Sequence, residues 1–367
     1  MKFYKIILIF LSLLMYSCSS SDDTIETPID PDPVVELYFP PNSTDVWETS
    51  TPNSLSWNTT NLQDLYDYLE EKNSKGFIIL KDGKIVVEQY FNGHTQNSNW
   101  IWYSAAKSLT STVIGIAQDE GIINVNNKTS DYLGNNWSSL TQEKQNLITV
   151  KHHLTMTTGM QSDLTDALAW ACTLPICLDY EADAGSRWAY HQGAFTLLQK
   201  MINNGTAGMT FNNYYNQKLK TKIGMNGSWN DFLFLNLYSS TTRSMARFGL
   251  LTLNKGKWKD ETIVSENYYN SMISTSQNLN KSYGYLWWLN GKESFMGTNS
   301  QDIITGSIIP NAPTDMFAAL GAKDQKIYVI PSKNMVIIRC GESAGLEELA
   351  NSSFDNELWE KINAVID

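Results

Sequence analysis

Strand-like runs lie toward both ends of this 367-residue chain, and helical patterns fill its middle. Residues 76–80 and 84–90 are apolar runs joined by Asp82-Gly83, a pair that favours a tight type I′ hairpin. Three further runs with short connections stand near the other end, at 316–320, 326–330 and 335–339. We therefore expect an α+β fold, in which one antiparallel sheet is built from both termini and is flanked by helices.

The helical patterns set the expected boundaries within the domain. Apolar residues recur with helical spacing over 61–72, and a final helix is expected at about 355–365. The sheet region should comprise about 46–103 and 312–367, and the long segment 104–311 should form a mostly helical subdomain. A cleft between these two regions is the natural place for a site.

The first residues have the pattern of a secretion signal. A positively charged start is followed by an apolar run, 6–15, which is too short to span a bilayer. It ends at Tyr16-Ser17-Cys18, which resembles a loose bacterial lipobox, so we expect a signal peptide at 1–17 and lipidation of Cys18. Residues 18–45 have the composition of a flexible tether.

This N-terminal pattern predicts a location at the bacterial outer membrane, either periplasmic or surface-exposed. The membrane would be contacted through the lipid anchor alone. The alternative is an ordinary signal peptide that happens to contain a cysteine.

Charge and cysteine spacing restrict the classes of partner. The formal net charge is −11 and the sequence has no basic stripe, which argues against nucleic-acid binding. In an exported protein, Cys172 and Cys177 can close a short loop through a disulfide, and Cys340 at the end of an apolar run should be a buried thiol. The Cys and His spacings do not fit a metal site. We expect a monomer with no metal and no organic cofactor.

The segment from Ser104 to Gln118 carries the clearest chemical signal. It has the pattern of an alanine-rich helix, and it places Lys107 three residues after Ser104 on the same helix face. A helix N-terminus favours negative charge that develops at the serine, and a lysine desolvated by an apolar helix can take the serine proton. The alternative is a serine cap followed by an ordinary surface lysine.

A second serine stands in Gly341-Glu-Ser-Ala-Gly345, which fits the nucleophile elbow of α/β-hydrolases. In that fold the acid and the histidine follow the serine along the chain, but all four histidines here precede Ser343. We therefore interpret this segment as a strand followed by a turn, and we expect Ser104 rather than Ser343 to be the nucleophile.

Five segments occur in the order and spacing of one known family: YSAAKSLTSTVIGIAQDEGII (103–123), LTMTTGM (154–160), RWAYHQGAFTLL (187–198), TTRSMARFGLLTLNKGKW (241–258) and YGYLWW (283–288). They resemble the serine β-lactamase-related hydrolases. That group includes class C β-lactamases, DD-peptidases, certain esterases and 6-aminohexanoate-dimer hydrolases. The resemblance extends from about residue 46 to the C-terminus and implies a β-lactamase/transpeptidase-like fold.

The resemblance implies roles for residues beyond Ser104 and Lys107. The family's Tyr-x-Asn motif falls on 190–192, which makes Tyr190 the proton shuttle, places Gln192 at the substrate and turns His191 away. The backbone N–H groups of Ser104 and Ala322 would form the oxyanion hole.

The third family motif falls on Ala319-Leu320-Gly321. Gly321 would let the substrate approach the strand edge. Ala319 stands where relatives carry a Lys or His that helps to bind a substrate carboxylate, and its methyl group cannot do this. Tyr283 or Trp287 could line the acyl pocket or could simply belong to the core.

These observations predict a serine hydrolase that cleaves a small ester, amide or peptide through an acyl-enzyme on Ser104. Two alternatives remain open at this point. One is a DD-peptidase or weak β-lactamase. The other is a non-catalytic cell-surface protein that retains the fold and binds peptidoglycan, peptides or glycans.

Overall fold

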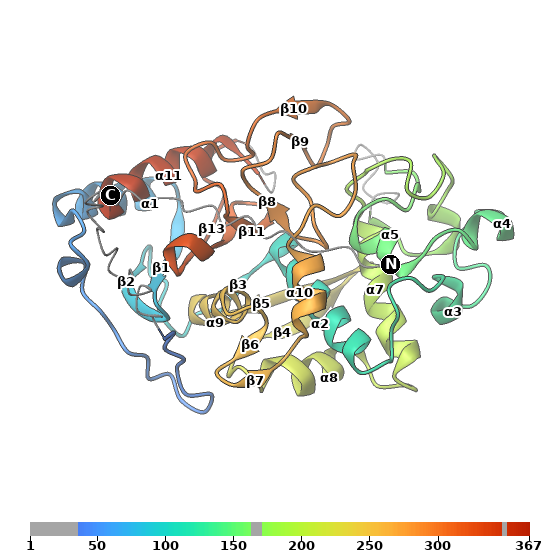
Figure 1. The fold of residues 1–367 in the computed structure, drawn as a ribbon, viewed down its shortest axis with the longest axis horizontal. Coiled ribbons are helices and arrows are strands. Elements are labelled where there is room, and N and C mark those ends of the chain that lie inside the picture. Colours follow the sequence, from blue (N-terminus) through green and yellow to red (C-terminus); the bar gives the residue numbers. More distant parts are fainter. Residues whose placement is uncertain (1–35, 163–170, 347–350) are drawn as a thin grey trace, which may run out of the picture. The chain divides into compact units, whose positions relative to one another are not determined.

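The computed structural model describes residues 36–162, 171–346 and 351–367, so the predicted signal peptide and Cys18 lie outside the described residues. Its main sheet has six strands in the order β2-β1-β13-β12-β11-β8, and the neighbouring strands pair antiparallel (Figure 1). The prediction of one sheet from both ends of the chain is confirmed. The strands are β1 (Ser74–Lys81), β2 (Lys84–Tyr90), β8 (Trp288–Leu289), β11 (Phe317–Gly321), β12 (Gln325–Ile330) and β13 (Met335–Gly341).

The turn between β1 and β2 follows directly from its two residues. Asp82 and Gly83 have φ values of 51° and 81°, as a type I′ turn requires, and the strands pair up to Lys81 opposite Lys84. Gly83 also lies so close to the backbone of Tyr38 that an added Cβ would be 2.0 Å from its carbonyl oxygen. The position therefore needs glycine for conformation and for space.

The two faces of the sheet are covered by different helices because strand side chains alternate between them. On one face, Ile327 and Val336 lie against Gly249 of α9 (Thr242–Leu253). On the other face, Tyr328 packs its ring against Trp359 of α11 (Ser353–Ile366). The helix α1 (Leu62–Glu71) contacts α11 and β1. Both terminal helices match the predicted ranges to within a few residues.

The central segment contains more strand than the sequence predicts. Besides β8, it supplies β4 (Ser228–Phe232) and β5 (Leu235–Ser240), which form a second sheet with β3 (Trp100–Ile101) in the order β3-β5-β4. Two-stranded ribbons add β6 (Lys257–Trp258), β7 (Glu261–Thr262), β9 (Ser294–Met296) and β10 (Ile303–Thr305). The expectation of a mostly helical region missed these strands because most of them are too short to show a period of two.

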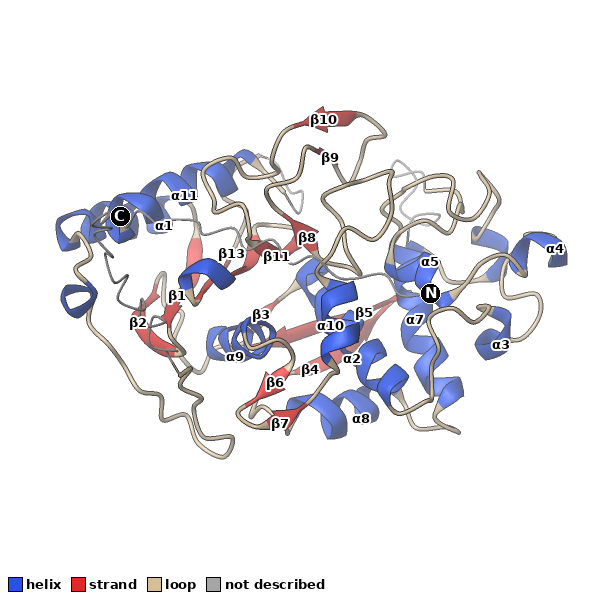
Figure 2. Ribbon diagram, in the orientation of Figure 1, coloured by secondary structure: helices blue, strands red, loops and turns tan. Residues whose placement is uncertain are grey.

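Most of the remaining described helices lie against the long central pair α2 and α7: α3, α5 and α8 contact α7, and α10 contacts α2 (Figure 2). α2 is buried over Ala106 to Ala117, which matches its nearly continuous small and apolar sequence. The helices are α2 (Ala106–Asp119), α3 (Ser130–Leu133), α4 (Gln142–Gln145), α5 (Val150–Leu154), α7 (Gln192–Gly205), α8 (Phe211–Tyr215) and α10 (Glu266–Met272).

Part of the segment expected to be a tether packs against the domain. The Tyr38 N–H donates to the Asp82 carbonyl at 3.0 Å. The Arg247 guanidinium donates to the carbonyl oxygens of Pro41 and Thr44 at 2.9 and 3.1 Å. Residues 36–45 therefore belong structurally to the domain, and the expected boundary near residue 46 lies about ten residues too late.

Candidate active site

Ser104 lies in a 3₁₀ turn, Tyr103–Ala105, that leads directly into α2. The preceding residue, Tyr103, has φ 46°, a conformation that bulky residues rarely adopt. Trp102 anchors the turn, because its backbone N–H donates to the Tyr238 carbonyl at 2.9 Å and its indole N–H donates to the Ser240 hydroxyl at 2.8 Å. Strained backbone that is held this firmly is common at functional sites.

Lys107 turns its ammonium group toward Ser104, and the Nζ–Oγ distance is 2.9 Å. The helical spacing of three residues therefore produces the contact that the sequence predicts. The Lys107 side chain is 2% exposed, and this burial lowers its pKa from 10.5 to about 7. A substantial fraction of the amine is neutral near pH 7 as a result, so it can accept a proton from the serine.

Two aromatic rings and one amide complete the surroundings of the Lys107 amine. Nζ lies 4.9 Å from the centre of the Tyr190 ring and 4.8 Å from that of Phe195. It also donates a short hydrogen bond to the Gln192 side-chain oxygen. The contacts with Gln192 and Phe195 were not predicted. Their spacing of three residues at the start of α7 indicates that they share one face of the helix. Only the folded structure shows that this face lies against α2.

Tyr190 reaches the serine from the extended segment before α7. Its phenol hydrogen-bonds to Ser104, which lowers the phenol pKa, but burial is the larger effect and raises that pKa above its usual value. Tyr190 is therefore protonated at neutral pH and can pass a proton on. His191 points elsewhere: its Nδ1 accepts from the Ala194 N–H at 3.2 Å and caps α7. Burial lowers the pKa of His191 to about 4.

The end of β11 lies directly against the serine turn. A Cβ added to Gly321 would be 2.4 Å from the Trp102 carbonyl oxygen and 2.9 Å from the Ala105 nitrogen. Only glycine permits this approach. It brings the strand end, and Ala322 after it, next to Ser104, as the proposed pair of oxyanion-hole N–H groups needs.

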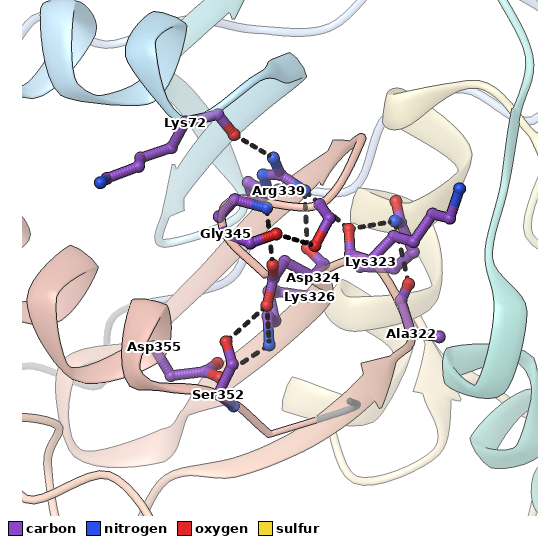
Figure 3. Close-up of polar contacts among 12 residues, drawn as sticks. Lys72, Ala322, Lys323, Asp324, Lys326, Arg339, Gly345, Ser352 and Asp355 are labelled. Carbon is purple, nitrogen blue, oxygen red and sulfur yellow. Dashed lines mark hydrogen bonds and ion pairs between the residues drawn. The ribbon is translucent and has the colours of Figure 1, made fainter. Parts of the chain in front are cut away.

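A buried network of charges holds the turn after β11 (Figure 3). The Arg339 guanidinium donates to the carbonyl oxygens of Lys323 and Asp324, each at 3.0 Å. The Lys326 ammonium lies 3.2 Å from the Asp324 carboxylate and 2.7 Å from that of Asp355 in α11. Lys323 and Asp324 both have positive φ, at 56° and 62°. The network thus fixes a turn that its own residues would not readily adopt.

Gln325 ties the same turn to β13. Its side-chain N–H₂ donates to the Ala322 carbonyl at 3.2 Å and to the Gly341 carbonyl at 2.7 Å, and its side-chain oxygen accepts from the Gly341 N–H at 3.1 Å. The Gly341–Gly345 turn therefore serves as a support for the strand end beside Ser104.

Ser343 lies in the turn that follows β13. Its hydroxyl donates to the Gly345 carbonyl at 2.9 Å. The rings of His152, His153 and His191 hydrogen-bond to backbone groups near the starts of α5 and α7. The segment Gly341–Gly345 ends β13 and forms a turn, as the sequence analysis predicts.

Three residues expected at the substrate are buried. Trp287 is 0% exposed and packs against Phe248 and Phe317, at centroid distances of 5.8 and 5.2 Å, so it contributes to the core. Tyr283 is also covered and meets the Tyr190 ring edge-on, behind the site. The Ala319 methyl group is fully covered too, and a methyl group cannot bind a carboxylate.

The described residues include one disulfide and one free cysteine. Cys172 and Cys177 are joined by a disulfide, with their Cα atoms 5.8 Å apart, and Cys340 is a buried free thiol. Within the described ranges, no group of three or more His, Cys, Asp or Glu side chains could hold a metal ion. None of the helices in the same ranges is long and apolar enough to cross a membrane.

Comparison with known protein families gives one match. Residues 68–231, which include Ser104, Lys107, Tyr190 and Gln192, match the model of the β-lactamase family. This match and the names of the structural neighbours support the serine β-lactamase-related family for this chain. The family match and the names of the structural neighbours support a general hydrolase role. No curated protein matches the chain significantly.

Solved structures share the fold of this chain at low sequence identity. A Bacillus anthracis protein assigned as a 6-aminohexanoate-dimer hydrolase has a TM-score of 0.66 and 18% identity, covering 89% of this chain and 88% of its own. A penicillin-binding protein from Bacillus halodurans has a TM-score of 0.60 and 16% identity, covering 82% of this chain and 99% of its own. A family VIII carboxylesterase has a TM-score of 0.62 and 13% identity, covering 83% of this chain and 97% of its own. At these identities the likeness shows a β-lactamase/transpeptidase-like fold and no finer activity.

Proposed function

We propose that this protein is a serine hydrolase that cleaves an ester or amide bond through an acyl-enzyme intermediate on Ser104. The observation that carries the proposal is the buried amine of Lys107, which lies 2.9 Å from the Ser104 hydroxyl and has a pKa of about 7. A base with a pKa near the working pH and within hydrogen-bond distance of the nucleophile meets both requirements of general-base catalysis.

The reaction begins when the neutral Lys107 amine takes the Ser104 proton and Oγ attacks the substrate carbonyl carbon. The backbone N–H groups of Ser104 and Ala322 stabilise the negative oxygen of the tetrahedral intermediate. Tyr190, which contacts both Ser104 and Lys107, passes the proton to the leaving group as the carbonyl re-forms. Water then attacks the acyl ester by the same route in reverse and releases the acid and the free serine.

The substrate side favours simple esters over β-lactams. Relatives bind a ring carboxylate with a Lys or His at the position of Ala319, and here a buried methyl group occupies it. The family VIII carboxylesterase among the structural neighbours has a name consistent with ester cleavage. We expect efficient turnover of short p-nitrophenyl esters and weak turnover of penicillins and cephalosporins. Turnover of β-lactams as efficient as that of the esters would contradict this expectation.

Labelling with a fluorophosphonate probe tests the proposal. The wild-type domain should be labelled, Ser104→Ala should not be labelled, and Lys107→Ala and Tyr190→Phe should each label at least about a hundredfold more slowly. Ser343→Ala is the matched control and should label within a few-fold of wild type. A folded wild-type protein that is never labelled would instead favour the non-catalytic binding protein.

A further inference from the structure

The loop closed by the Cys172–Cys177 disulfide lies against α7. The carbonyl oxygen of Cys172 comes so close to Gly193, in the first turn of the helix, that a Cβ added there would be 2.3 Å from it. One residue further along, the Thr173 hydroxyl accepts from the Lys200 ammonium at 2.8 Å. Gly193 and Lys200 are about two helical turns apart on one side of α7, so the loop backbone packs along that side. Both Cys172 and Thr173 are buried.

A different face of the same helical turn carries the contacts with Lys107. The Gln192 side-chain oxygen accepts the short hydrogen bond from Nζ, and the Phe195 ring centre lies 4.8 Å from that atom. Gly193 is displaced from Gln192 by about 100° around the helix axis, on the side away from Phe195. The first turn of α7 is thus held between the Lys107 amine and the backbone of the disulfide loop.

The disulfide determines where this loop backbone can lie. Cys177 is followed by Leu178, which is fully buried and whose carbonyl oxygen accepts from the Ser139 N–H at 3.2 Å. Residues 174–176, between the two cysteines, are exposed. A covalent cross-link removes conformational freedom from the loop that it closes. The bond therefore ties Cys172 to a fixed part of the domain across an exposed segment.

We propose that the Cys172–Cys177 disulfide is a positioning element of the active site, which keeps Gln192 against the Lys107 amine, and that its reduction by a dithiol lowers the activity. The inference rests on the proposed hydrolase function, because it concerns the base of that reaction. When the bond opens, the Cys172 backbone can withdraw from Gly193, and the first turn of α7 loses its support. Water then reaches the amine, which favours the ammonium form and leaves less of the neutral base.

The reduction is a thiol–disulfide exchange. Cys177 is half-buried and Cys172 is fully covered, so a thiolate of the reductant attacks the Cys177 sulfur and forms a mixed disulfide with it. Cys172 leaves as a thiolate and takes up a proton. The second thiolate of the reductant then displaces Cys177 and closes a disulfide within the reductant. The cysteine pair gains two electrons and two protons, which the dithiol loses.

Reduction of the folded protein with dithiothreitol tests the inference without any substitution. Alkylation of a denatured sample and mass spectrometry first establish that Cys172 and Cys177 have become free thiols. After removal of the reductant, fluorophosphonate labelling at pH 7 should be at least about fivefold slower. Its pH profile should move upward by about half a unit or more, because the amine is less desolvated. Reoxidation should restore both. In the control variant Cys172→Ala/Cys177→Ser, labelling should be slow from the start and insensitive to dithiothreitol.

Gly193→Ala tests the contact itself. Its methyl group would overlap the Cys172 carbonyl oxygen, so in the disulfide-bonded protein it should displace α7 and slow labelling at least about tenfold. In the Cys172→Ala/Cys177→Ser background the loop can yield, and the same change should slow labelling by less than about a further threefold. Gly205→Ala, at the far end of α7, is the control and should have the same effect in both backgrounds.

Hydrogen exchange separates this inference from the proposed function. Reduction should speed exchange over residues 189–198 and leave α11 unchanged, whether or not the protein is a hydrolase. A wild-type protein that is never labelled would refute the hydrolase, and exchange would still decide whether the disulfide positions α7. The inference is overturned by unchanged exchange after full reduction, by a labelling rate that does not fall, by a slower rate whose pH profile does not move, or by additive effects of Gly193→Ala and disulfide removal.

Discussion

At the scale of single residues, the chemistry depends on keeping the Lys107 amine buried beside a neutral partner. Burial removes water from the ammonium, which disfavours the charged form and lowers the pKa to about 7. The rings of Tyr190 and Phe195 offset part of this cost through cation–π contact. The amide of Gln192 accepts a hydrogen bond from Nζ without adding a negative charge that would restore the usual pKa.

The pKa of Lys107 predicts how acylation depends on pH. The amine is a base only when it is deprotonated, and deprotonation becomes complete as the pH rises above about 7. The rate of fluorophosphonate labelling or of ester acylation should therefore rise through an apparent pKa near 7 and level off above it. A rate that stays flat between pH 5 and 9 would exclude Lys107 as the base.

Replacing Gln192 tests the effect of the neutral partner. In Gln192→Glu, a carboxylate next to Nζ should favour the ammonium form and raise the pKa of Lys107. The pH profile should move upward by at least about one unit, and the rate at pH 7 should fall about tenfold or more. Gln192→Leu is the uncharged control and should lower the rate without moving the profile upward. A pH–rate profile that is not shifted in Gln192→Glu would contradict the contact between Gln192 and the Lys107 amine.

At the scale of elements, the site depends on how closely the end of β11 approaches the turn that carries Ser104. Gly321 makes this approach possible, and the buried network of Arg339, Lys326 and Gln325 holds the following turn. A buried ion pair of this kind loses much more when one partner is removed than it contributes as a pair.

Gly321→Ala should separate the two elements. The added methyl group would overlap the backbone at residues 102 and 105, so the strand or the serine turn must move. We expect at least a tenfold loss of activity, with a melting temperature lower by several degrees. Gly297→Ala is the control, because its Cβ would meet only one atom, at 3.7 Å, and it should leave both quantities nearly unchanged. Wild-type activity in Gly321→Ala would refute the close approach.

The parts of this arrangement that the sequence predicts are those that depend on local chemistry. The Asp82-Gly83 turn, the terminal helices and the contact between Ser104 and Lys107 follow from a turn dipeptide, a helical period and a spacing of three residues. The β3-β5-β4 sheet, the positive φ of Tyr103 and the place of Gln192 could not be predicted in this way, because packing between distant segments decides them.

At the scale of the whole molecule, strands from both ends of the chain meet in one sheet, and the site lies where β11 from the second half reaches the start of α2 from the first. The nucleophile and the proposed oxyanion-hole residue Ala322 are thus more than two hundred residues apart in sequence. The site therefore depends on contacts between segments that are distant in the sequence.

We also propose that the protein is exported and attached to the outer membrane by a lipid on Cys18, on the basis of the apolar run that ends there. Cys18→Ala should move the protein from the membrane fraction to the soluble fraction, whereas Ser19→Ala should leave it in place. Fractionation followed by mass spectrometry of the N-terminal peptide would measure this. A wild-type protein that is soluble after secretion would refute the anchor.

The acyl-enzyme itself is the most direct test of the central claim. The wild-type domain is mixed with a short p-nitrophenyl ester, quenched with acid within the first turnovers, and digested for mass spectrometry. We predict an acyl group on the peptide that contains Ser104, which is absent in Ser104→Ala and retained in Ser343→Ala. Ester turnover with the acyl group on another residue, or with undiminished activity in Ser104→Ala, would contradict the account.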